Sequence, residues 1–293
     1  MKSRSLETAI VGWALVLPTL AVLGFFVFLP AGQSLYLSFQ EVDPLARRHT
    51  FIGFSNYRNL LFSPDYWTSV WVTAKFAFVT VVAGVGLALA LAVALDANPY
   101  ARGLMRTVFL LPVSISSAMA AMLWIFLYNP TAGYLNFLLD LVGGQGPNWL
   151  GSSKWALTSV AITTIWKEMG FSIIFLLAGL AGVPNELKEA ALVDGAGPVR
   201  RFWHVTLPIL SPTLFFVTVV SVIHSFESFG QIHILTGGGP FGKTTTLVYN
   251  LYIDAFVNFR TGYASAQAVL LFLLMMAATA VQFRIANKRV HYG

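Results

Sequence analysis

The sequence contains no cysteine and few charged residues, and both absences narrow the class of protein. Without cysteine the chain forms no disulfide and offers no thiolate to a metal. Charged residues make up only 10% of the chain, whereas a soluble domain carries about 25%. Hydrophobic residues reach 57%, with a mean hydropathy of +0.72. Because the apolar runs are continuous rather than alternating, the composition predicts a membrane protein built of helices and not of barrel strands.

The sequence also lacks any grouping of residues typical of a catalytic or metal site. Its five histidines are scattered, and His224 and His233 have no metal-ligand spacing with another ligand. No serine, histidine and aspartate fall in a nucleophile arrangement, which weakens a membrane-bound enzyme as an alternative. The first apolar run is too long for a secretory leader and ends in no clean cleavage site, so we expect it to remain as an anchor.

Six stretches are apolar enough to cross a bilayer, which requires about 20 residues per helix. They lie at about residues 9–39, 67–95, 104–128, 155–182, 202–230 and 261–285. No linker suggests a second domain, so we expect residues 1–293 to form a single transmembrane domain. The predicted fold class is an all-α polytopic membrane protein with six transmembrane helices, of which the first should bend at Pro18 and Pro30.

The lysines and arginines in the connections predict the orientation, because cytoplasmic loops carry an excess of them. One side holds ten of these residues: Lys2, Arg4, Arg102, Arg106, Lys188, Arg200, Arg201, Arg284, Lys288 and Arg289. The other side holds six: Arg47, Arg48, Arg58, Lys154, Lys243 and Arg260. We therefore expect both termini in the cytoplasm. The net charge of +6 is interpreted as this topology, and nothing in it favours a nucleic-acid partner.

A polar stretch at residues 185–208 interrupts the apolar second half of the chain. Asn185 is the predicted N-cap of a short helix, and Gly195 should end that helix in the left-handed conformation. Pro198 suits the first turn of a second helix, and Pro208 should end or kink that helix. The charge bias places this coupling hairpin (185–201) on the cytoplasmic side.

The same stretch resembles the EAA motif of bacterial ABC importer permeases. The motif has the form EAA, three residues, G, nine residues, then I-x-L-P, and the only departure here is Val205 for isoleucine. The resemblance implies a type I importer permease fold, in which this loop is a coupling helix that docks on an ATP-binding subunit. The positions that it assigns to coupling are Glu189, Ala190, Ala191, Leu192, Val193, Asp194, Gly195, Leu207 and Pro208. A solvated hairpin between two spans is the alternative.

Other segments resemble the carbohydrate-uptake branch of these permeases, related to the larger maltose permease subunit. The segments WIFLYNP (124–130), GAGPVRRF (195–202) and VQFRIANKRVHYG (281–293) are most like the A-type permeases of glycerol-3-phosphate importers. The resemblance implies uptake of glycerol-3-phosphate or of a glycerophosphodiester such as glycerophosphocholine. The alternative is a permease for a sugar such as maltose or trehalose, and a secondary transporter, which normally shows internal repeats, is less favoured.

The resemblance also implies partners and a location. The partners would be a second homologous permease, a dimer of ATP-binding subunits, an extracytoplasmic solute-binding protein and membrane lipid. ATP and Mg would be bound by the ATP-binding subunits, so this chain needs no cofactor and is not itself an enzyme. The implied location is the bacterial inner membrane.

Residues 237–244 match the phosphate-binding pattern G-x-x-x-x-G-K-[ST]. A true P-loop follows a buried strand and opens a helix, whereas this segment follows a predicted span on the non-cytoplasmic side. We interpret it as a glycine-rich turn. It resembles the outer loop of related permeases, which implies that Gly238, Gly239 and Pro240 contact the solute-binding protein.

Ionisable residues inside the spans are costly to bury and are candidates for the translocation path. The candidate path residues are Lys75, Trp166, Lys167, Glu168, His224 and Glu227. His224 and Glu227 are three residues apart and share a helix face. The alternative is that the charged groups pair among themselves or that Lys75 reaches the membrane interface, and that the aromatic rings only pack helices.

Overall fold

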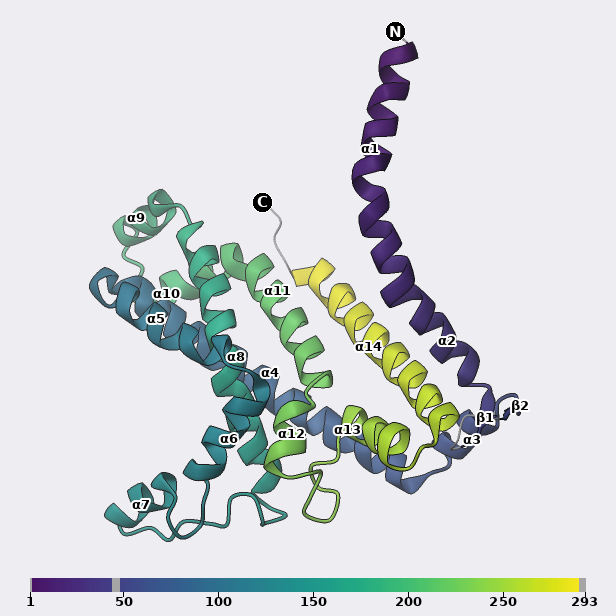
Figure 1. Cartoon of the computed structure of the whole chain (residues 1–293). Helices are drawn as coiled ribbons and strands as arrows, with labels where there is room; N and C mark the ends of the chain where they lie inside the picture. The colour runs from purple at the N-terminus through teal and green to yellow at the C-terminus, as the bar shows by residue number, and fades with distance from the viewer. Residues whose placement is uncertain (1, 44–47, 290–293) are drawn as a thin grey trace. The chain divides into compact units, whose positions relative to one another are not determined.

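The computed structural model describes residues 2–43 and 48–289. Arg47, one of the residues used for orientation, and the last four residues of the segment 281–293 lie outside the described residues. Helices dominate the described chain, as Figure 1 shows. The first half contains α1 (Lys2–Leu23), η1 (Gly24–Phe28), α2 (Leu29–Leu37), β1 (Gln40–Val42), β2 (His49–Phe51), α3 (Ser55–Leu61), α4 (Pro64–Ala97), α5 (Pro99–Ser114), α6 (Ser117–Leu127) and α7 (Tyr134–Leu141).

In the second half, residues 185–201, which were predicted to be the coupling hairpin and are called the coupling stretch below, lie between two long helices. Its elements are α8 (Ala156–Ala181), α9 (Asn185–Val193), α10 (Pro198–Arg201), η2 (Phe202–Thr206), α11 (Leu207–Phe226), α12 (Gly230–Leu235), α13 (Leu247–Tyr252), η3 (Ile253–Val257) and α14 (Thr261–Arg289). The segments labelled η are π-helical turns. The described strands, β1 and β2, pair antiparallel in the first connection.

Within the described residues, five helical segments are long and apolar enough to cross a membrane. They are Val11–Leu37, Pro64–Ala97, Ala156–Ala181, Pro198–Phe226 and Thr261–Ala286. The third predicted span, 104–128, is not a single continuous helix, because Thr107–Ser114 and Ser117–Leu127 meet at 108°. Ser116 has an extended backbone with ψ 154, and its side chain accepts a hydrogen bond from the Met119 amide. This N-cap starts a new helix, so the absence of charged residues from a stretch does not guarantee a straight span.

Pro208 does not end its helix, and that helix begins before Phe202, the residue near which the fifth span was expected to start. The helical segment runs from Pro198 to Phe226. A proline lacks the N–H of a normal helical bond and crowds the preceding turn. Here the preceding turn is η2, a widened π-turn in which Leu207 N–H donates to the Phe202 carbonyl, and Pro208 follows directly. The first span repeats the arrangement, with η1 followed by Leu29 and Pro30.

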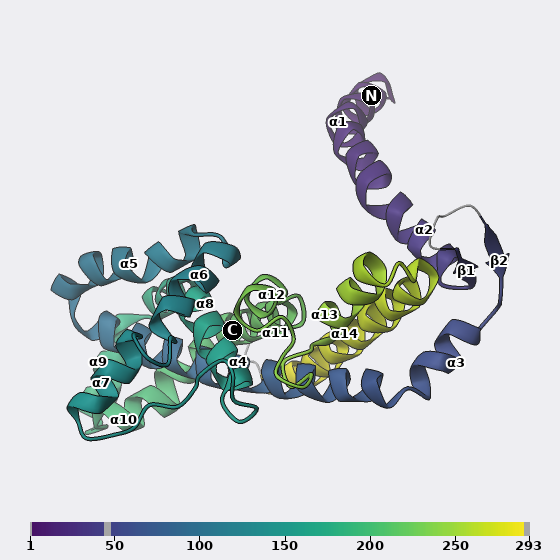
Figure 2. The same cartoon turned by 60° about the horizontal axis from the view of Figure 1, so that its bottom comes forward.

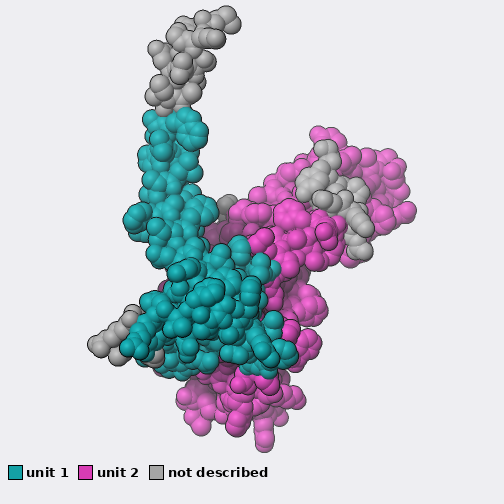
Figure 3. All heavy atoms as spheres, turned by 90° about the vertical axis from the view of Figure 1, so that its right-hand side faces the viewer, with its two compact units in different colours: residues 1–63, 251–273 teal, residues 64–250, 274–293 magenta. Residues whose placement is uncertain are grey.

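The chain divides into two compact units, coloured in Figure 3. Unit 1 comprises residues 1–63 and 251–273, and unit 2 comprises residues 64–250 and 274–293. Unit 1 is held together around the end of α2. Asn56 Nδ2 donates to the carbonyls of Ser38 and Gln40, at 3.0 and 2.9 Å. Gly262 packs so closely that an added Cβ would lie 2.0 Å from the Gln40 carbonyl oxygen, so only glycine fits there.

Unit 2 is built around α8, which packs against α4, α5 and α11 (Figure 2). The core consists of fully or almost fully buried apolar residues: Val85, Ala88, Ala92, Leu95, Ile173, Leu176, Leu180, Leu210 and Val217. Small residues permit close helix approach, as is usual in membranes. An added Cβ at Gly170 would lie 1.9 Å from the Phe109 carbonyl oxygen, and one at Gly179 would meet Leu210 and Thr213 of α11.

Candidate functional site

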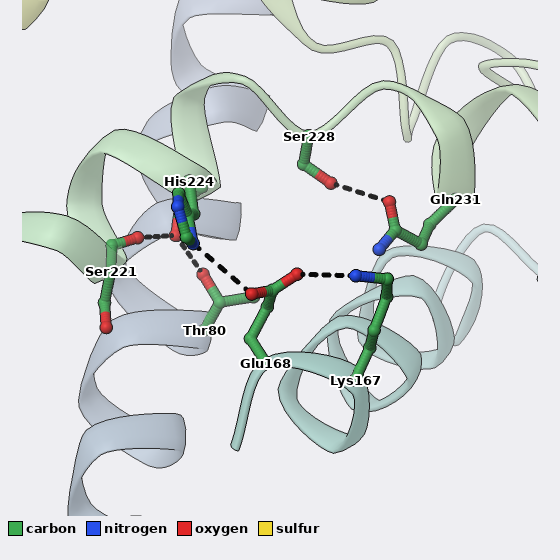
Figure 4. A network of polar contacts seen from close by, with 8 residues as sticks. Thr80, Lys167, Glu168, Ser221, His224, Ser228 and Gln231 are labelled. Carbon is green, nitrogen blue, oxygen red and sulfur yellow. Dashed lines mark hydrogen bonds and ion pairs between the residues drawn. The ribbon is translucent and has the colours of Figure 1, made fainter. Parts of the chain in front are cut away.

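A polar cluster lies where α8 and α11 meet in unit 2, as Figure 4 shows. Lys167 Nζ lies 3.1 Å from Glu168 Oε1, and His224 Nδ1 lies 3.3 Å from Glu168 Oε2. Glu168 thus stands between a cation and an imidazole. Successive residues on a helix do not normally face each other, so the Lys167–Glu168 contact requires the two side chains to turn toward one another. The lysine side chain is 12% exposed and the glutamate side chain 32% exposed.

Hydroxyl groups connect this cluster to α4. Thr80 Oγ1 and Ser225 Oγ are 2.8 Å apart, and Ser225 Oγ also donates to the Ser221 carbonyl at 2.7 Å. Beyond the end of α11, Ser228 Oγ donates to Gln231 Oε1 at 3.4 Å. Three helices, α4, α8 and α11, therefore contribute polar groups to one region of the unit 2 interior (Figure 4).

Two cavities adjoin the cluster. The smaller, about 30 Å³, is lined by Thr80, Thr164, Glu168 and His224 among others. The larger, about 190 Å³, is lined by Ser117, Thr164, Glu168, His224, Glu227, Ser228, Phe229, Gly230 and Gln231. The larger lining offers carboxylates, hydroxyls, an amide and an imidazole, which are hydrogen-bond partners for a hydroxylated solute. Among residues 2–43 and 48–289, no three His, Asp or Glu side chains gather as metal ligands.

The structure brings together four of the six predicted path residues. Lys167, Glu168 and His224 form ion pairs, and Glu227 joins Glu168 and His224 in lining the larger cavity. Glu227 is the C-cap of α11, so it lies at the end of the helix and not within it. The pairing that we gave as the alternative for Lys167 and Glu168 is present, and it leaves contact with a substrate untested.

Lys75 and Trp166 lie apart from that cluster. Lys75 is exposed on α4, with Nζ 5.1 Å from the centre of the Trp71 ring. The Trp166 ring packs edge-on against Trp124 at 5.7 Å, and Trp124 continues to Tyr128 at 5.1 Å. Trp166 lines neither cavity. Its ring belongs to an aromatic row that joins α6 to α8, which is the packing role considered as the alternative.

The coupling stretch presents an uncovered helix to its surroundings. No residue of α9 is buried, and Leu192 and Val193 are 54% and 88% exposed. Lys188 Nζ lies 3.7 Å from Asp96 Oδ2, which connects α9 to the end of α4. Asn185 begins the helix but does not cap it: the N-cap is Pro184, and no side chain caps the helix start. The N-cap prediction was therefore wrong by one residue.

The predicted turn after α9 is confirmed. Gly195 has φ +74, the conformation that glycine adopts at little cost. Its amide donates to the Leu192 carbonyl at 3.0 Å, and the Ala196 amide donates to the Ala191 carbonyl at 2.9 Å. This pair of bonds is the Schellman ending of a helix. Pro198 then occupies the first position of α10, as expected.

The glycine-rich segment is a turn, as the sequence analysis predicted. It follows α12 rather than a strand. Thr244, the position that would hold Mg²⁺ in a P-loop, is fully buried, and its Oγ1 donates to the Gly239 carbonyl at 2.7 Å. Gly238 is buried against Tyr249. The exposed tip is Phe241, which is 93% exposed at φ +51.

Sequence reasoning missed Thr80, Ser225, Gln231 and Phe241. Hydroxyl residues within spans often bond their own backbone, so Thr80 and Ser225 carry no signal until α4 and α11 are placed side by side. For Phe241 the sequence carries a weak indication of exposure, because an aromatic residue between a proline and a glycine in a turn has nothing to pack against.

Comparison with known proteins places these features in a family. Residues 81–292 match the family described as "Binding-protein-dependent transport system inner membrane component". The sn-glycerol-3-phosphate transport system permease protein of Agrobacterium fabrum is 39% identical over 294 residues, covering 100% of both chains. That of Yersinia pestis is 38% identical over 283 residues, covering 96% of this chain and 95% of the relative.

Solved structures show the same fold. A bacterial alginate ABC transporter in complex with alginate pentasaccharide-bound periplasmic protein contains a chain that superimposes with a TM-score of 0.85 at 22% identity, covering 97% of this chain and 96% of that one. A chain of the MetNI methionine ABC transporter superimposes with a TM-score of 0.55 at 18% identity, over 76% of this chain and 95% of that one.

Proposed function

Since the chain belongs to the family of binding-protein-dependent transport system inner membrane components, we propose that it forms half of the translocation pathway of an ABC importer for glycerol-3-phosphate. A glycerophosphodiester such as glycerophosphocholine is included in the proposal. The observation that carries it is the 39% identity, over the whole of both chains, to a permease named for sn-glycerol-3-phosphate transport. A second homologous permease would supply the other half.

The substrate is tested by uptake. The permease pair, its ATP-binding subunits and its solute-binding protein are reconstituted in liposomes with ATP inside. We expect uptake of labelled glycerol-3-phosphate or glycerophosphocholine, and none without ATP. Uptake of maltose or trehalose alone would contradict the substrate, and uptake without ATP would contradict the importer class.

The polar cluster is proposed as part of the translocation path. Its larger cavity has room and hydrogen-bond partners for the hydroxyl groups of a small polar solute. The carboxylates of Glu168 and Glu227 disfavour a phosphate in that cavity, so we assign the cavity to binding the glycerol portion of the solute. Lys75 and Lys167 are the candidate partners of the phosphate, and Lys167 reaches it only by leaving Glu168. Replacing either lysine by glutamine should raise the KM for glycerol-3-phosphate more than that for glycerophosphocholine, whose phosphate carries less charge.

The coupling stretch is proposed to receive movement from the partner ATPase. Leu192 and Val193 are apolar and uncovered, and such side chains on a short projecting helix suit a hydrophobic cleft of a partner. Glu189 would provide a polar contact beside them, and Gly195 holds the turn. This assignment supports a division of labour in which partner subunits bind and hydrolyse ATP while this chain moves solute.

The turn at residues 237–244 is proposed to contact the solute-binding protein, with Phe241 as the contacting side chain. Gly238, Gly239 and Pro240 shape the turn, and Phe241 projects from it. Exposed aromatic rings are frequent anchors of protein interfaces. Phe241→Ala should weaken binding of the solute-binding protein severalfold, measured by surface plasmon resonance on the reconstituted transporter. Phe62→Ala, at a position 80% exposed in another segment, is the control, and equal losses in both would contradict the assignment.

A further inference from the structure

Unit 1 contains a cavity that the proposed transport path does not use. Its volume is about 400 Å³, within the range of about 300–1,000 Å³ typical of small-molecule sites. Its lining includes Glu41 of β1 and, around the start of α14, Phe259, Arg260, Gly262 and Tyr263. One wall directly follows the end of the span that includes α2, and another opens the span formed by α14. The cavity therefore lies at a boundary between membrane and water.

Arg260 is held in a fixed position on one wall. Its Nη1 lies 3.6 Å from Asp254 Oδ1, and its guanidinium carbon lies 4.2 Å from the centre of the Tyr263 ring. Its backbone amide donates to the Asp254 carbonyl at 2.8 Å. The side chain is still 55% exposed, and a guanidinium has five N–H donors. Arg260 can thus bind an anion while remaining paired with Asp254.

The buried carboxylate of Asp254 orients the Arg260 side chain. The aspartate side chain is 8% exposed. Oδ2 accepts a hydrogen bond from Gln267 Nε2 at 2.6 Å, and Oδ1 accepts one from Asn258 Nδ2 at 3.0 Å. A buried carboxylate that accepts hydrogen bonds at both oxygens is held in one orientation, and it therefore restricts the orientation of the side chains that pair with it. The arginine is consequently oriented before any ligand arrives, which lowers the entropy cost of binding.

The second charge of the cavity is negative. Glu41 lies in β1 between buried Gln40 and Val42, and its own side chain is exposed. The contact of Gly262 with the Gln40 carbonyl holds the start of α14 against this strand. One cavity is therefore lined by a cation and an anion on different segments, with Phe259, 56% exposed, as an apolar surface beside them.

We propose that this cavity binds the headgroup of a zwitterionic phospholipid, in which a phosphate carries an ammonium group. Arg260 pairs with the phosphate, because a guanidinium matches phosphate oxygens with two parallel donors. Glu41 pairs with the ammonium. The acyl chains lie along the membrane, where Leu35 and Tyr36 at the end of α2 are 48% and 64% exposed. A soluble phosphodiester with an ammonium group has the same polar chemistry, but it lacks the acyl chains that the span ends favour.

The test measures binding of a short-chain lipid to the full-length chain in detergent. The probe is dihexanoylphosphatidylethanolamine, followed by isothermal titration calorimetry. Dihexanoylphosphatidylglycerol lacks the ammonium, and glycerophosphoethanolamine lacks the acyl chains. The parent should bind phosphatidylethanolamine most tightly. Arg260→Gln should weaken that binding on the order of tenfold, whereas Arg58→Gln, an exposed position outside the lining, should leave it unchanged.

If Arg260→Gln fails to fold, Glu41→Gln provides a second test of the site. Since Glu41 is exposed, its substitution should preserve the fold and remove the preference for phosphatidylethanolamine over phosphatidylglycerol. An unchanged preference in Glu41→Gln, or full binding by folded Arg260→Gln, would overturn the site. Equal affinity for glycerophosphoethanolamine and for the lipid would overturn the assignment to lipid and identify a soluble phosphodiester as the ligand.

Discussion

The carboxylate of Glu168 lies 3.1 Å from Lys167 Nζ and 3.3 Å from His224 Nδ1, so the effect of removing its charge depends on these two groups. Removing one partner of a buried ion pair leaves an uncompensated charge, which costs several kcal/mol in a dry interior. Glu168 is partly exposed, with a side chain 32% accessible, so the expected cost is smaller. The side chain is therefore a positioning residue for Lys167 and His224 as well as a candidate for solute contact.

Glu168→Gln should lower the free energy of unfolding by about 1–2 kcal/mol. The loss arises because Lys167 keeps its charge without a carboxylate beside it. The measurement is thermal unfolding of the purified chain in detergent. Glu227→Gln is the matched control: Glu227 is exposed, so its substitution should change stability by no more than about 0.5 kcal/mol. Equal destabilisation by both substitutions would show that the pairing contributes nothing.

Gly195 and Gly197 offer a matched pair for testing the turn of the coupling stretch. Both lie in open space, but Gly195 has φ +74 whereas Gly197 has φ −64. A valine is strained only at the first position, by about 1–2 kcal/mol. Gly195→Val should insert normally into the membrane and lose ATP-coupled uptake, while Gly197→Val should retain it. Uptake by Gly195→Val at the parent level would contradict the role of the turn.

At the scale of elements, α9 is a helix of which no residue is buried within the described chain, and its Val193 is 88% exposed. Val193→Glu should weaken association with the ATP-binding subunits by at least tenfold, because a charge would enter a hydrophobic cleft. Co-purification of the ATP-binding subunits measures this. Val142→Glu adds the same charge at an equally open position, 80% exposed next to α7. Loss of association in that control, or retention in Val193→Glu, would contradict the docking surface.

The sequence predicted some elements well because single residues determine them. A positive φ selects glycine, so Gly195 could be assigned its conformation, and a fixed φ selects proline, so Pro198 could be placed in the first helical turn. The long spans followed from hydropathy alone. The coupling role of residues 185–201 stays a prediction from the spacing of the motif, which is a family property and not a consequence of hydropathy.

Other features depend on contacts that a sequence does not show. The 108° break lies between Ser114 and Ser117, within an uncharged stretch. The hydropathy of that stretch did not predict the break, because hydropathy carries no information about helix direction. Pro208 was expected to end or kink a helix, and the helix continues past it because the π-turn ahead of it accommodates the proline. The residues of the polar cluster were predicted as part of a set that also included Lys75. The separation of Lys75 from Glu168 was not predicted, because it depends on which faces of α4 and α8 carry the two side chains.

At the scale of the whole molecule, the charge count predicts the orientation in the membrane. The absence of cysteine makes this directly measurable, since a single introduced thiol has no background. A thiol at Ser153, exposed before α8, should react with a membrane-impermeant maleimide in spheroplasts. A thiol at Glu186, exposed in α9, should react only after permeabilisation. The reverse pattern would invert the topology and remove α9 from contact with a cytoplasmic ATPase.

The π-turn at Phe202–Thr206 sets the rotational phase between the coupling stretch and α11. A π-turn holds one residue more than an α-turn, and each residue turns a helix by about 100°. The face of α11 that carries His224 is thus offset from α10, the helix that ends the coupling stretch, by a single extra residue. Deleting Val205 should form a continuous α-helix and turn the two faces out of phase. Solute-loaded binding protein should then fail to stimulate ATP hydrolysis, although every contacting side chain is still present; undiminished stimulation would contradict this role for the π-turn.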